Sequence, residues 1–324
     1  MTHLSNNEIQ NWLPWRLVNH STDTLCQWLY TGNKNFTEPF FDDTILNCRN
    51  LVENCKPFKV VSDLQIMEQW AGTTQTFTPT AIIFHVSRCG STLLSQLLSI
   101  GQSNIVLSEV PFFDDILRLP YKKNAAESFV PFNFLKTAIK FYSRPHNGNE
   151  SLVFVKTDSW HLHFYDQFRA QFPSVPFIFL YRNPIDVIIS HQRRRGMHSV
   201  PGIIEPAVFG FSNEQIIEFS MDEYLENVIA GYFNKMIEIS KADPLVLPVN
   251  YSEGMSSIMK KMNNFLGLDI TKETEKLLEE RSRFHAKYPQ QLFKEANIEF
   301  TRPGKLLSVS RLYTELEQIR MLKH

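Results

Sequence analysis

The sequence predicts an α/β protein built on a parallel sheet with helices on its faces. From Thr80 onward, apolar β-branched runs of strand length alternate with longer amphipathic stretches, which is the pattern of such a sheet. The first of these runs leads directly into a short turn containing Gly90 and then into a helix. Polar or charged residues stand directly after each predicted strand, where open parallel sheets bind their ligands.

Residues 1–75 are predicted to form a small helical N-terminal extension, and residues 76–324 the main domain. The extension should contain three helices, because Ser and Asp side chains precede apolar residues at helical spacing. The first helix would carry Leu25, Trp28 and Leu29 on one face. The capping residues expected at the three helix starts are Ser21 or Asp23, Asp42 or Asp43, and Asp63.

The main domain is predicted to hold five parallel strands joined by helices. The strands are expected at residues 81–84, 104–107, 152–155, 175–181 and 245–249. Long helices are expected at residues 221–241, 255–266, 271–281 and 306–320.

The stretch from Thr80 to Gly101 predicts an anion site. A strand that turns directly into a helix points several backbone N–H groups, and the positive end of the helix dipole, at one place. Arg88 adds a charge there, while Ser91 and Thr92 add hydroxyl groups. The fold is therefore P-loop-like. It lacks a Walker loop, because Gly90 is followed by serine instead of the lysine that the Walker motif requires.

The residues after the other strands should meet this turn at one sheet edge. They are Glu109 after the second strand, Lys156 and Asp158 after the third, Arg182 and Ser190 after the fourth, and Tyr251 after the fifth. The Asn183-Pro184 pair predicts a helix start, which would put Ser190 about two turns up that helix.

Two of these stretches resemble motifs of the sulfotransferases that use 3′-phosphoadenosine 5′-phosphosulfate (PAPS). HVSRCGSTLL resembles the family's phosphosulfate-binding loop, and LYRNPIDVIIS resembles its 3′-phosphate motif. They occur in the family's order and spacing, with Lys156 after the strand between them. The resemblance covers roughly residues 80–253 and implies the sulfotransferase fold, an enzyme, and PAPS as sulfuryl donor without a metal.

Carried over by position, the resemblance gives each loop residue a role. Arg88 would lie beside the oxygen that bridges phosphate and sulfate, and Tyr251 near the adenine. Arg182 and Ser190 would bind the 3′-phosphate. The loop positions that the resemblance implies bind the 5′-phosphate end of PAPS are Cys89, Gly90, Ser91 and Thr92.

The sequence departs from the cytosolic members of this family in several places. Those members carry Lys-x-His after the third strand, with the histidine as base, whereas Asp158 stands here at the histidine position. Branches without that histidine place a glutamate after the second strand, as Glu109 stands here, and the arginine at position 88 is found in the bacterial and carbohydrate-type branches. The C-terminal Arg-Lys-Gly loop of the family has only an approximate counterpart in residues 301–305.

Sulfuryl transfer needs a base for the acceptor and positive charge for the leaving phosphate. We expect Glu109 to be the base, ahead of Asp158 and then His161. Arg88, with help from Lys156, is expected to neutralise the leaving group. The alternatives are a P-loop kinase, which would need the missing Walker lysine, and an inert module that binds PAPS or its product. Cys89 as a nucleophile has no histidine base assigned beside it.

Composition limits the partners. The formal net charge is −1, with 33 Lys and Arg against 34 Asp and Glu, which argues against bulk attraction to nucleic acid or membrane. The sequence shows neither a signal pattern nor an apolar run of membrane-spanning length, so a cytoplasmic protein with four reduced cysteines is expected. Residues 111–144 and 193–212, rich in aromatic residues, should wall a pocket for a small and preferably apolar acceptor. The aromatic stretch 36–41 is expected only to pack.

Overall fold

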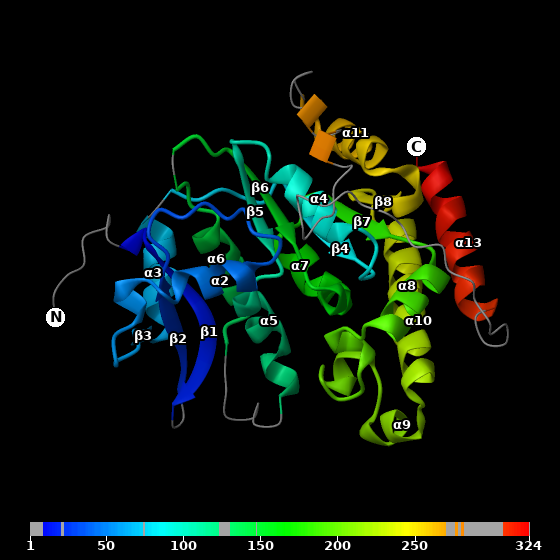
Figure 1. Cartoon of the computed structure of the whole chain (residues 1–324), viewed down its shortest axis with the longest axis horizontal. Helices are drawn as coiled ribbons and strands as arrows, with labels where there is room; N and C mark the ends of the chain where they lie inside the picture. Colours follow the sequence, from blue (N-terminus) through cyan, green and yellow to red (C-terminus); the bar gives the residue numbers. More distant parts are fainter. Residues whose placement is uncertain are drawn as a thin grey trace.

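The computed structural model describes residues 9–20, 23–73, 75–122, 130–146, 148–269, 276–277, 280–281 and 307–323. Its centre is a five-stranded parallel sheet with strand order β5-β6-β4-β7-β8 (Figure 1). The strands are β4 (Ala81–His85), β5 (Asn104–Ser108), β6 (Leu152–Lys156), β7 (Phe177–Tyr181) and β8 (Val246–Asn250). All five predicted strands are confirmed, within two residues at either end.

The sheet is buried on both faces, which explains its continuous apolar runs. Every residue of β4, β7 and β8 is buried. The register pairs Ile83 of β4 with Lys156 of β6 and with Ile178 of β7, and it pairs Ser108 of β5 with Lys156. The carboxyl ends of neighbouring strands therefore lie level along one edge of the sheet.

Helices connect the strands, as the alternating pattern predicts. The helices that follow β4 to β7 are α4 (Ser91–Leu98), α5 (Pro111–Arg118), α6 (Phe134–Tyr142), α7 (Tyr165–Gln171), α8 (Pro184–Arg193), α9 (Asn213–Glu218) and α10 (Met221–Ala242). After β8 come α11 (Met255–Leu266) and α13 (Leu307–Leu322). The last two helices and α10 agree with the sequence prediction, whereas most of the helix expected at residues 271–281 lies outside the described residues.

The N-terminal extension is not purely helical, so that part of the prediction is wrong. It contains an antiparallel sheet of β1 (Trp12–His20), β2 (Asp23–Tyr30) and β3 (Val61–Ser62). Two helices of the extension, α2 (Phe41–Cys48) and α3 (Leu64–Thr73), form where the sequence predicts them.

The error in the extension has a physical cause. Leu25, Trp28 and Leu29 have helical spacing, but the buried positions Thr24, Cys26 and Trp28 alternate as a strand requires. Over eight residues neither the helical nor the strand period is clear. Hydrogen bonding to β1 along the whole of β2 stabilises the strand.

The extension packs directly on the main domain at α5 and α6 (Figure 1). The backbone N–H of Leu17 donates to Asp115 Oδ2 over 3.0 Å, and the buried guanidinium of Arg144 donates to the carbonyl of Trp12 over 2.9 Å. Buried apolar residues of the extension join the same hydrophobic core as the central sheet. The division at residues 75 and 76 remains a prediction.

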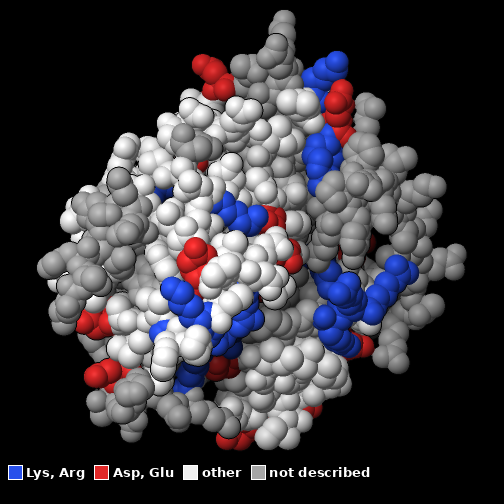
Figure 2. Space-filling view, turned by 60° about the vertical axis from the view of Figure 1, so that its left-hand side comes forward, with Lys and Arg blue, Asp and Glu red and all other residues white. Residues whose placement is uncertain are grey.

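Helices α10 and α13 lie side by side at the opposite end of the molecule from the β1–β3 sheet (Figure 1). None of the helices in the described part of the chain is long and apolar enough to cross a membrane. On the face in Figure 2, lysine and arginine side chains form small groups with acidic side chains close to them. That face has no broad area of one sign, in keeping with the near-zero formal charge.

Candidate active site

A cavity of about 610 Å³ opens at the carboxyl edge of the central sheet. Its walls come from the turns after β4, β5, β6, β7 and β8, and from two residues of the N-terminal extension, Phe40 and Asp42. Of the predicted site residues, the structure brings Arg88, Gly90, Ser91, Thr92, Glu109, Asp158, Arg182, Ser190 and Tyr251 to this one cavity.

The turn from β4 into α4 has an unusual backbone. Ser87 and Arg88 have φ of 54° and 51°, and Gly90 has φ of 83°. A left-handed conformation is costly for residues other than glycine, and such strain is concentrated at functional sites. The turn ends at the N-terminus of α4, where Ser91 and Thr92 are the first helical residues and line the cavity, so the first N–H groups of the helix, which have no intrahelical partner, lie at the cavity wall.

Gly90 is required by its surroundings as well as by its backbone. A Cβ atom at this position would lie 2.6 Å from the ring of Tyr251 and from Met255 Cε. The ring of Tyr251 therefore lies directly on the turn, and any side chain at position 90 would displace it.

Cys89 differs from its neighbours because its side chain points away from the cavity. Its thiol is buried and donates to the carbonyl of Leu180 over 3.4 Å. Burial raises the pKa of this thiol to about 12, so it stays protonated at neutral pH. Cys89 can offer a ligand its backbone N–H but no thiolate nucleophile.

Arg88 and Arg182 lie at the same cavity and carry its positive charge. Arg88 donates to the carbonyl of Arg194 over 2.9 Å, and burial together with Arg194 lowers its pKa. The Arg182 guanidinium lies 4.9 Å from the ring centre of Tyr251 and donates to Asp186 over 3.1 Å.

Ser190 reaches the cavity because of the way α8 begins. Asn183 caps the helix by accepting a hydrogen bond from the backbone N–H of Ile185 over 3.0 Å, and Pro184 is the first helical residue, as the sequence predicts. The helix then carries Ser190 back to the cavity that Arg182 lines.

Lys156 lies behind the cavity wall and does not line it. Its side chain is fully buried, and its ammonium donates to Glu109 Oε1 over 2.6 Å. Burial by itself would raise the pKa of Glu109, but the charge of Lys156 and hydrogen bonds from His85 and Lys156 outweigh burial and lower it to about 2. Glu109 is thus an ionised, ion-paired carboxylate.

His85 approaches the same oxygen of Glu109 as Lys156 does, with its Nε2 3.4 Å from Oε1. The backbone N–H of Ser87 donates to His85 Nδ1 over 3.1 Å, and Nε2 lies 2.9 Å from the carbonyl of Thr157. These contacts fit a neutral ring with the proton on Nε2, and burial lowers the pKa of His85.

Asp158 has the opposite electrostatics to Glu109 although both line the cavity. Burial and the negative charges of Glu109 and Asp114 raise the pKa of Asp158 well above its ordinary value, and Lys156 only partly offsets them. Asp158 also caps the short helical turn Ser159–Phe164.

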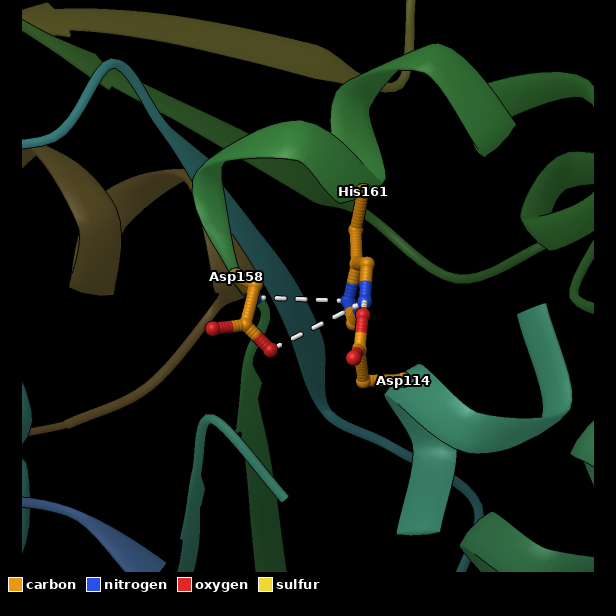
Figure 3. Close-up of side chains that lie close together, drawn as sticks. All are labelled: Asp114, Asp158 and His161. Carbon is orange, nitrogen blue, oxygen red and sulfur yellow. Dashed lines mark hydrogen bonds and ion pairs between the residues drawn. The ribbon is translucent and has the colours of Figure 1, made fainter. Parts of the chain in front are cut away.

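Asp114 and His161 lie next to Asp158 (Figure 3). His161 Nε2 lies 3.0 Å from Asp114 Oδ1, and the backbone N–H of Asp158 donates to His161 Nδ1 over 3.3 Å. Burial would raise the pKa of Asp114, but the hydrogen bond and charge of His161, together with Arg118, lower it to about 2. His161 is therefore held by both of its nitrogens and does not point freely at a substrate.

The same three residues are the one group in the described chain with metal-ligand spacing. Their ligand atoms lie within 4.8 Å of one another. Arg118 contacts Asp114 at 2.8 Å, however, and His161 is occupied by its hydrogen bonds, so this group is already satisfied without a cation. The sequence analysis did not foresee this grouping.

Several cavity residues were missed by the sequence analysis: Phe40, Asp42, His85, Asp114, Trp160, His191 and His198. His85 was open to prediction, since it is the last residue of β4. The aromatic stretch that includes Phe40 was expected only to pack, and the structure shows instead that one of its rings faces the cavity. The prediction for residues 302–305 lies outside the described residues.

Most of the aromatic residues expected to wall the acceptor pocket are in the hydrophobic core. Phe112, Phe134, Phe141 and Tyr142 are fully buried. The segments that contain the aromatic residues contribute mainly Pro111, Asp114, Gly196, Met197 and His198 to the cavity. The pocket is consequently more polar than composition suggested.

Comparison with known proteins places the chain in a family. The family model described as "Sulfotransferase domain" matches residues 78–303. None of the curated proteins searched matches the chain.

Solved structures with similar folds are sulfotransferases of low sequence identity. A sulfotransferase from Mycobacterium avium is 12% identical, with a TM-score of 0.45 over 67% of this chain and 71% of that one. The sulfotransferase domain from the curacin biosynthetic pathway is 15% identical, with a TM-score of 0.47 over 75% and 99%. A mouse sulfotransferase complexed with PAP is 11% identical, with a TM-score of 0.37 over 70% and 74%. On the strength of the family match, which spans most of its length, the chain belongs to the sulfotransferase domain family.

Proposed function

We propose that this protein transfers a sulfuryl group from PAPS to a hydroxyl or amine of a small acceptor. The observation that carries the proposal is that two separate anion-binding features face one cavity. One is the β4–α4 turn with Arg88, and the other is the pair Arg182 and Ser190 at the start of α8. A nucleotide with phosphates at both its 5′ and 3′ positions needs two such sites.

The residues present fit this nucleotide. The turn at Gly90 lines the cavity and ends at the N-terminus of α4, whose first N–H groups can donate to a phosphate group. Tyr251 offers a ring beside both the turn and Arg182, where an adenine could stack. When bound, PAPS supplies the sulfuryl group and the leaving phosphate.

The protein's own residues supply charge and positioning. Arg88 and the N–H groups of the turn stabilise the negative charge that grows on the leaving phosphate. Lys156, fully buried behind Glu109, acts by fixing that carboxylate. No described residue needs to form a covalent bond in an in-line displacement.

We assign the base to Asp158, ahead of Glu109. A general base works best when its pKa is close to the working pH, and the surroundings of Asp158 raise its pKa whereas those of Glu109 lower it to about 2. Asp158 also has no ion pair with a lysine or arginine among the described residues, and Glu109 is occupied by Lys156. The sequence ranked Glu109 first because branches of the family without the histidine have a glutamate after the second strand; the ion pair between Glu109 and Lys156 moves the proposal to Asp158.

The kinase alternative is disfavoured by the family match and by the turn, which has no lysine after Gly90. The inert-module alternative differs from the proposal only in turnover. We also propose that the protein belongs to the bacterial and carbohydrate-type branches, which carry an arginine and a glutamate at the positions of Arg88 and Glu109. A cytoplasmic location is proposed from the sequence.

Calorimetry with adenosine 3′,5′-bisphosphate tests the nucleotide site. We expect 1:1 binding that is much tighter than binding of 5′-AMP, because Arg182 and Ser190 contact the additional phosphate. Arg182→Ala should weaken bisphosphate binding by about 2–4 kcal/mol. Arg193→Ala, which removes an exposed arginine from the same helix outside the cavity, is the control and should have no effect.

Transfer of radiolabelled sulfuryl from PAPS to an acceptor mixture then tests catalysis. Equal affinity for 5′-AMP and the bisphosphate would overturn the 3′-phosphate assignment. Tight bisphosphate binding with no transfer to any acceptor, and no release of sulfate, would establish the inert module.

A further inference from the structure

Two arginines and four carboxylates line the cavity. Arg88, Arg182 and the β4–α4 turn form the part assigned above to the nucleotide. Four carboxylates, Asp42, Glu109, Asp114 and Asp158, line the same cavity. The four act on one another electrostatically: Glu109 and Asp114 both influence Asp42, and all three influence Asp158.

Half of this negative charge is uncompensated by protein cations. Glu109 pairs with Lys156 and Asp114 pairs with Arg118. Asp42 and Asp158 form no ion pair with a lysine or arginine in the described ranges of the chain. Burial and the neighbouring carboxylates raise the pKa of both, as expected for groups that lack a positive partner.

Two aromatic rings lie with these carboxylates. Phe40 lines the cavity two residues before Asp42, and the ammonium of Lys156 already lies 5.1 Å from the centre of its ring. Trp160 lines the cavity two residues after Asp158. The indole N–H of Trp160 donates to Asp114 Oδ1 over 2.6 Å, which fixes the ring. Carboxylates combined with aromatic faces are the arrangement that binds organic cations.

A buried polar atom at the same cavity also needs a partner. His198 lines the cavity and is only 3% exposed. Its Nε2 has no hydrogen-bond partner among the described residues, and burial, with His191 next in effect, lowers its pKa well below the ordinary value. A neutral imidazole in this position can make one hydrogen bond to a bound acceptor.

We propose that the acceptor is a cation, an amine- or guanidine-bearing molecule whose positive group is held by Asp42 in the part of the cavity that Trp160 also lines. The inference rests on the proposed function. Phe40 and Asp42 lie outside residues 78–303, so the N-terminal extension determines the charge preference of the acceptor site.

The transfer itself is balanced without any further reactant. A bond forms between the acceptor oxygen or nitrogen and sulfur, while the bond between sulfur and the bridging oxygen of PAPS breaks. The bonding electrons leave with the phosphate, and the acceptor's proton passes to Asp158. No atom is oxidised or reduced.

Matched phenols test the charge preference. Tyramine, 4-ethylphenol and 4-hydroxyphenylacetate share a phenol of similar size and carry a positive, a neutral and a negative group. We expect kcat/KM to be about tenfold higher for tyramine than for 4-ethylphenol, as one partly screened ion pair with an aromatic contact provides. The anionic phenol should be the poorest acceptor. Glucosamine and glucose repeat the comparison on a sugar, so that the outcome does not depend on one scaffold.

Asp42→Asn should remove the preference for tyramine, and Asp43→Asn should preserve it. Both residues lie in the first turn of α2, and only Asp42 lines the cavity, so the control matches the effect on helix stability. Affinity for adenosine 3′,5′-bisphosphate should be unchanged in both variants. Binding of the amines to the bisphosphate-loaded protein, followed by ligand-observed NMR, gives the same comparison without turnover.

The outcomes separate this inference from the proposed function. Failure to bind the bisphosphate overturns the proposed function. Bisphosphate binding with equal use or equal binding of charged and neutral acceptors overturns the cation inference alone. A preference that survives Asp42→Asn, or no binding of either amine at millimolar concentration, overturns it as well.

Discussion

The Lys156 ammonium lies 2.6 Å from Glu109 Oε1, and the lysine side chain is fully buried. The two residues come from the ends of adjacent strands, since Lys156 ends β6 and Glu109 follows β5. Glu109 has φ of 54°, a strained value that this ion pair helps to maintain. The pair thus joins the sheet edge to the cavity wall.

Removing Lys156 should destabilise the fold. Lys156→Met leaves a partly buried carboxylate without its cation, and we expect the free energy of unfolding to fall by about 3–5 kcal/mol. Adding Glu109→Gln should recover part of this loss because the uncompensated charge is then gone. Urea denaturation of the two single variants and the double variant measures the coupling. Additive losses would show that the ion pair contributes nothing of its own.

The two candidate bases are separated by turnover. Asp158→Asn should lower kcat by about 10²–10⁴-fold and leave bisphosphate affinity nearly unchanged, since a base acts only while the acceptor loses its proton. Glu109→Gln should lower kcat less. Both variants must fold and bind the bisphosphate for the comparison to hold. If Glu109→Gln is then inactive while Asp158→Asn is nearly normal, Glu109 is the base.

Arg88→Ala should affect turnover more than nucleotide affinity. The charge of Arg88 matters most as the phosphate becomes a leaving group, so kcat/KM should fall much further than bisphosphate affinity. kcat/KM of the wild type and of Arg88→Ala is measured with one acceptor, and their affinities for the bisphosphate are measured by calorimetry. Equal losses in the two measurements would mean that Arg88 only holds the phosphate.

Gly90→Ala should weaken nucleotide binding because of Tyr251. The added Cβ would lie 2.6 Å from the ring of Tyr251, so the ring must move off the turn. Gly202→Ala is a matched control, with a φ of 80° against 83° and nothing within 4 Å of the added atom. Both changes carry the cost of a left-handed alanine, and only Gly90→Ala should lower bisphosphate affinity, by about tenfold or more. Similar affinities in the two variants would contradict the close contact.

The pH dependence should report the raised pKa of Asp158. A base must be deprotonated, so kcat/KM should fall as the pH drops through a pKa well above the ordinary aspartate value of about 3.9. If Glu109 were the base, its pKa of about 2 would leave the profile flat over this range. The pH–rate profile from pH 4 to 9 is the measurement.

Stability gives an independent check on the same group. A carboxyl with a raised folded-state pKa binds its proton more tightly in the folded than in the unfolded protein. Its contribution to stability therefore falls as the pH rises from the unfolded-state pKa to the folded-state pKa. Asp158→Asn should abolish that fall, so the variant should gain stability relative to the wild type across this window. A difference that does not change with pH would contradict the raised pKa.

The main-domain strands were predictable because each is a short apolar run that turn residues bound and a helical stretch follows, as expected for strands buried on both faces. The cavity residues that follow strands, such as Arg88 and Asp158, were predictable because a parallel sheet brings the carboxyl ends of its strands to one edge. The β1–β2 hairpin was not, since Leu25, Trp28 and Leu29 fit a helix and only pairing with β1 excludes it.

Electrostatic roles were beyond the sequence. Glu109 and Asp158 occupy equivalent positions after neighbouring strands, and only the structure shows that Lys156 points at the first. Phe40 and Asp42 reach the cavity through tertiary packing of the extension, which no local pattern reveals.

The acidic part of the cavity has a consequence for product release. Sulfation adds a negative charge to an acceptor whose positive group lies at Asp42, and Glu109 and Asp114 are already paired with Lys156 and Arg118. The product therefore keeps its attraction to Asp42 but gains a repulsion from that carboxylate which its precursor lacks. Under the proposed function, the sulfated product should bind more weakly than the acceptor, which limits product inhibition.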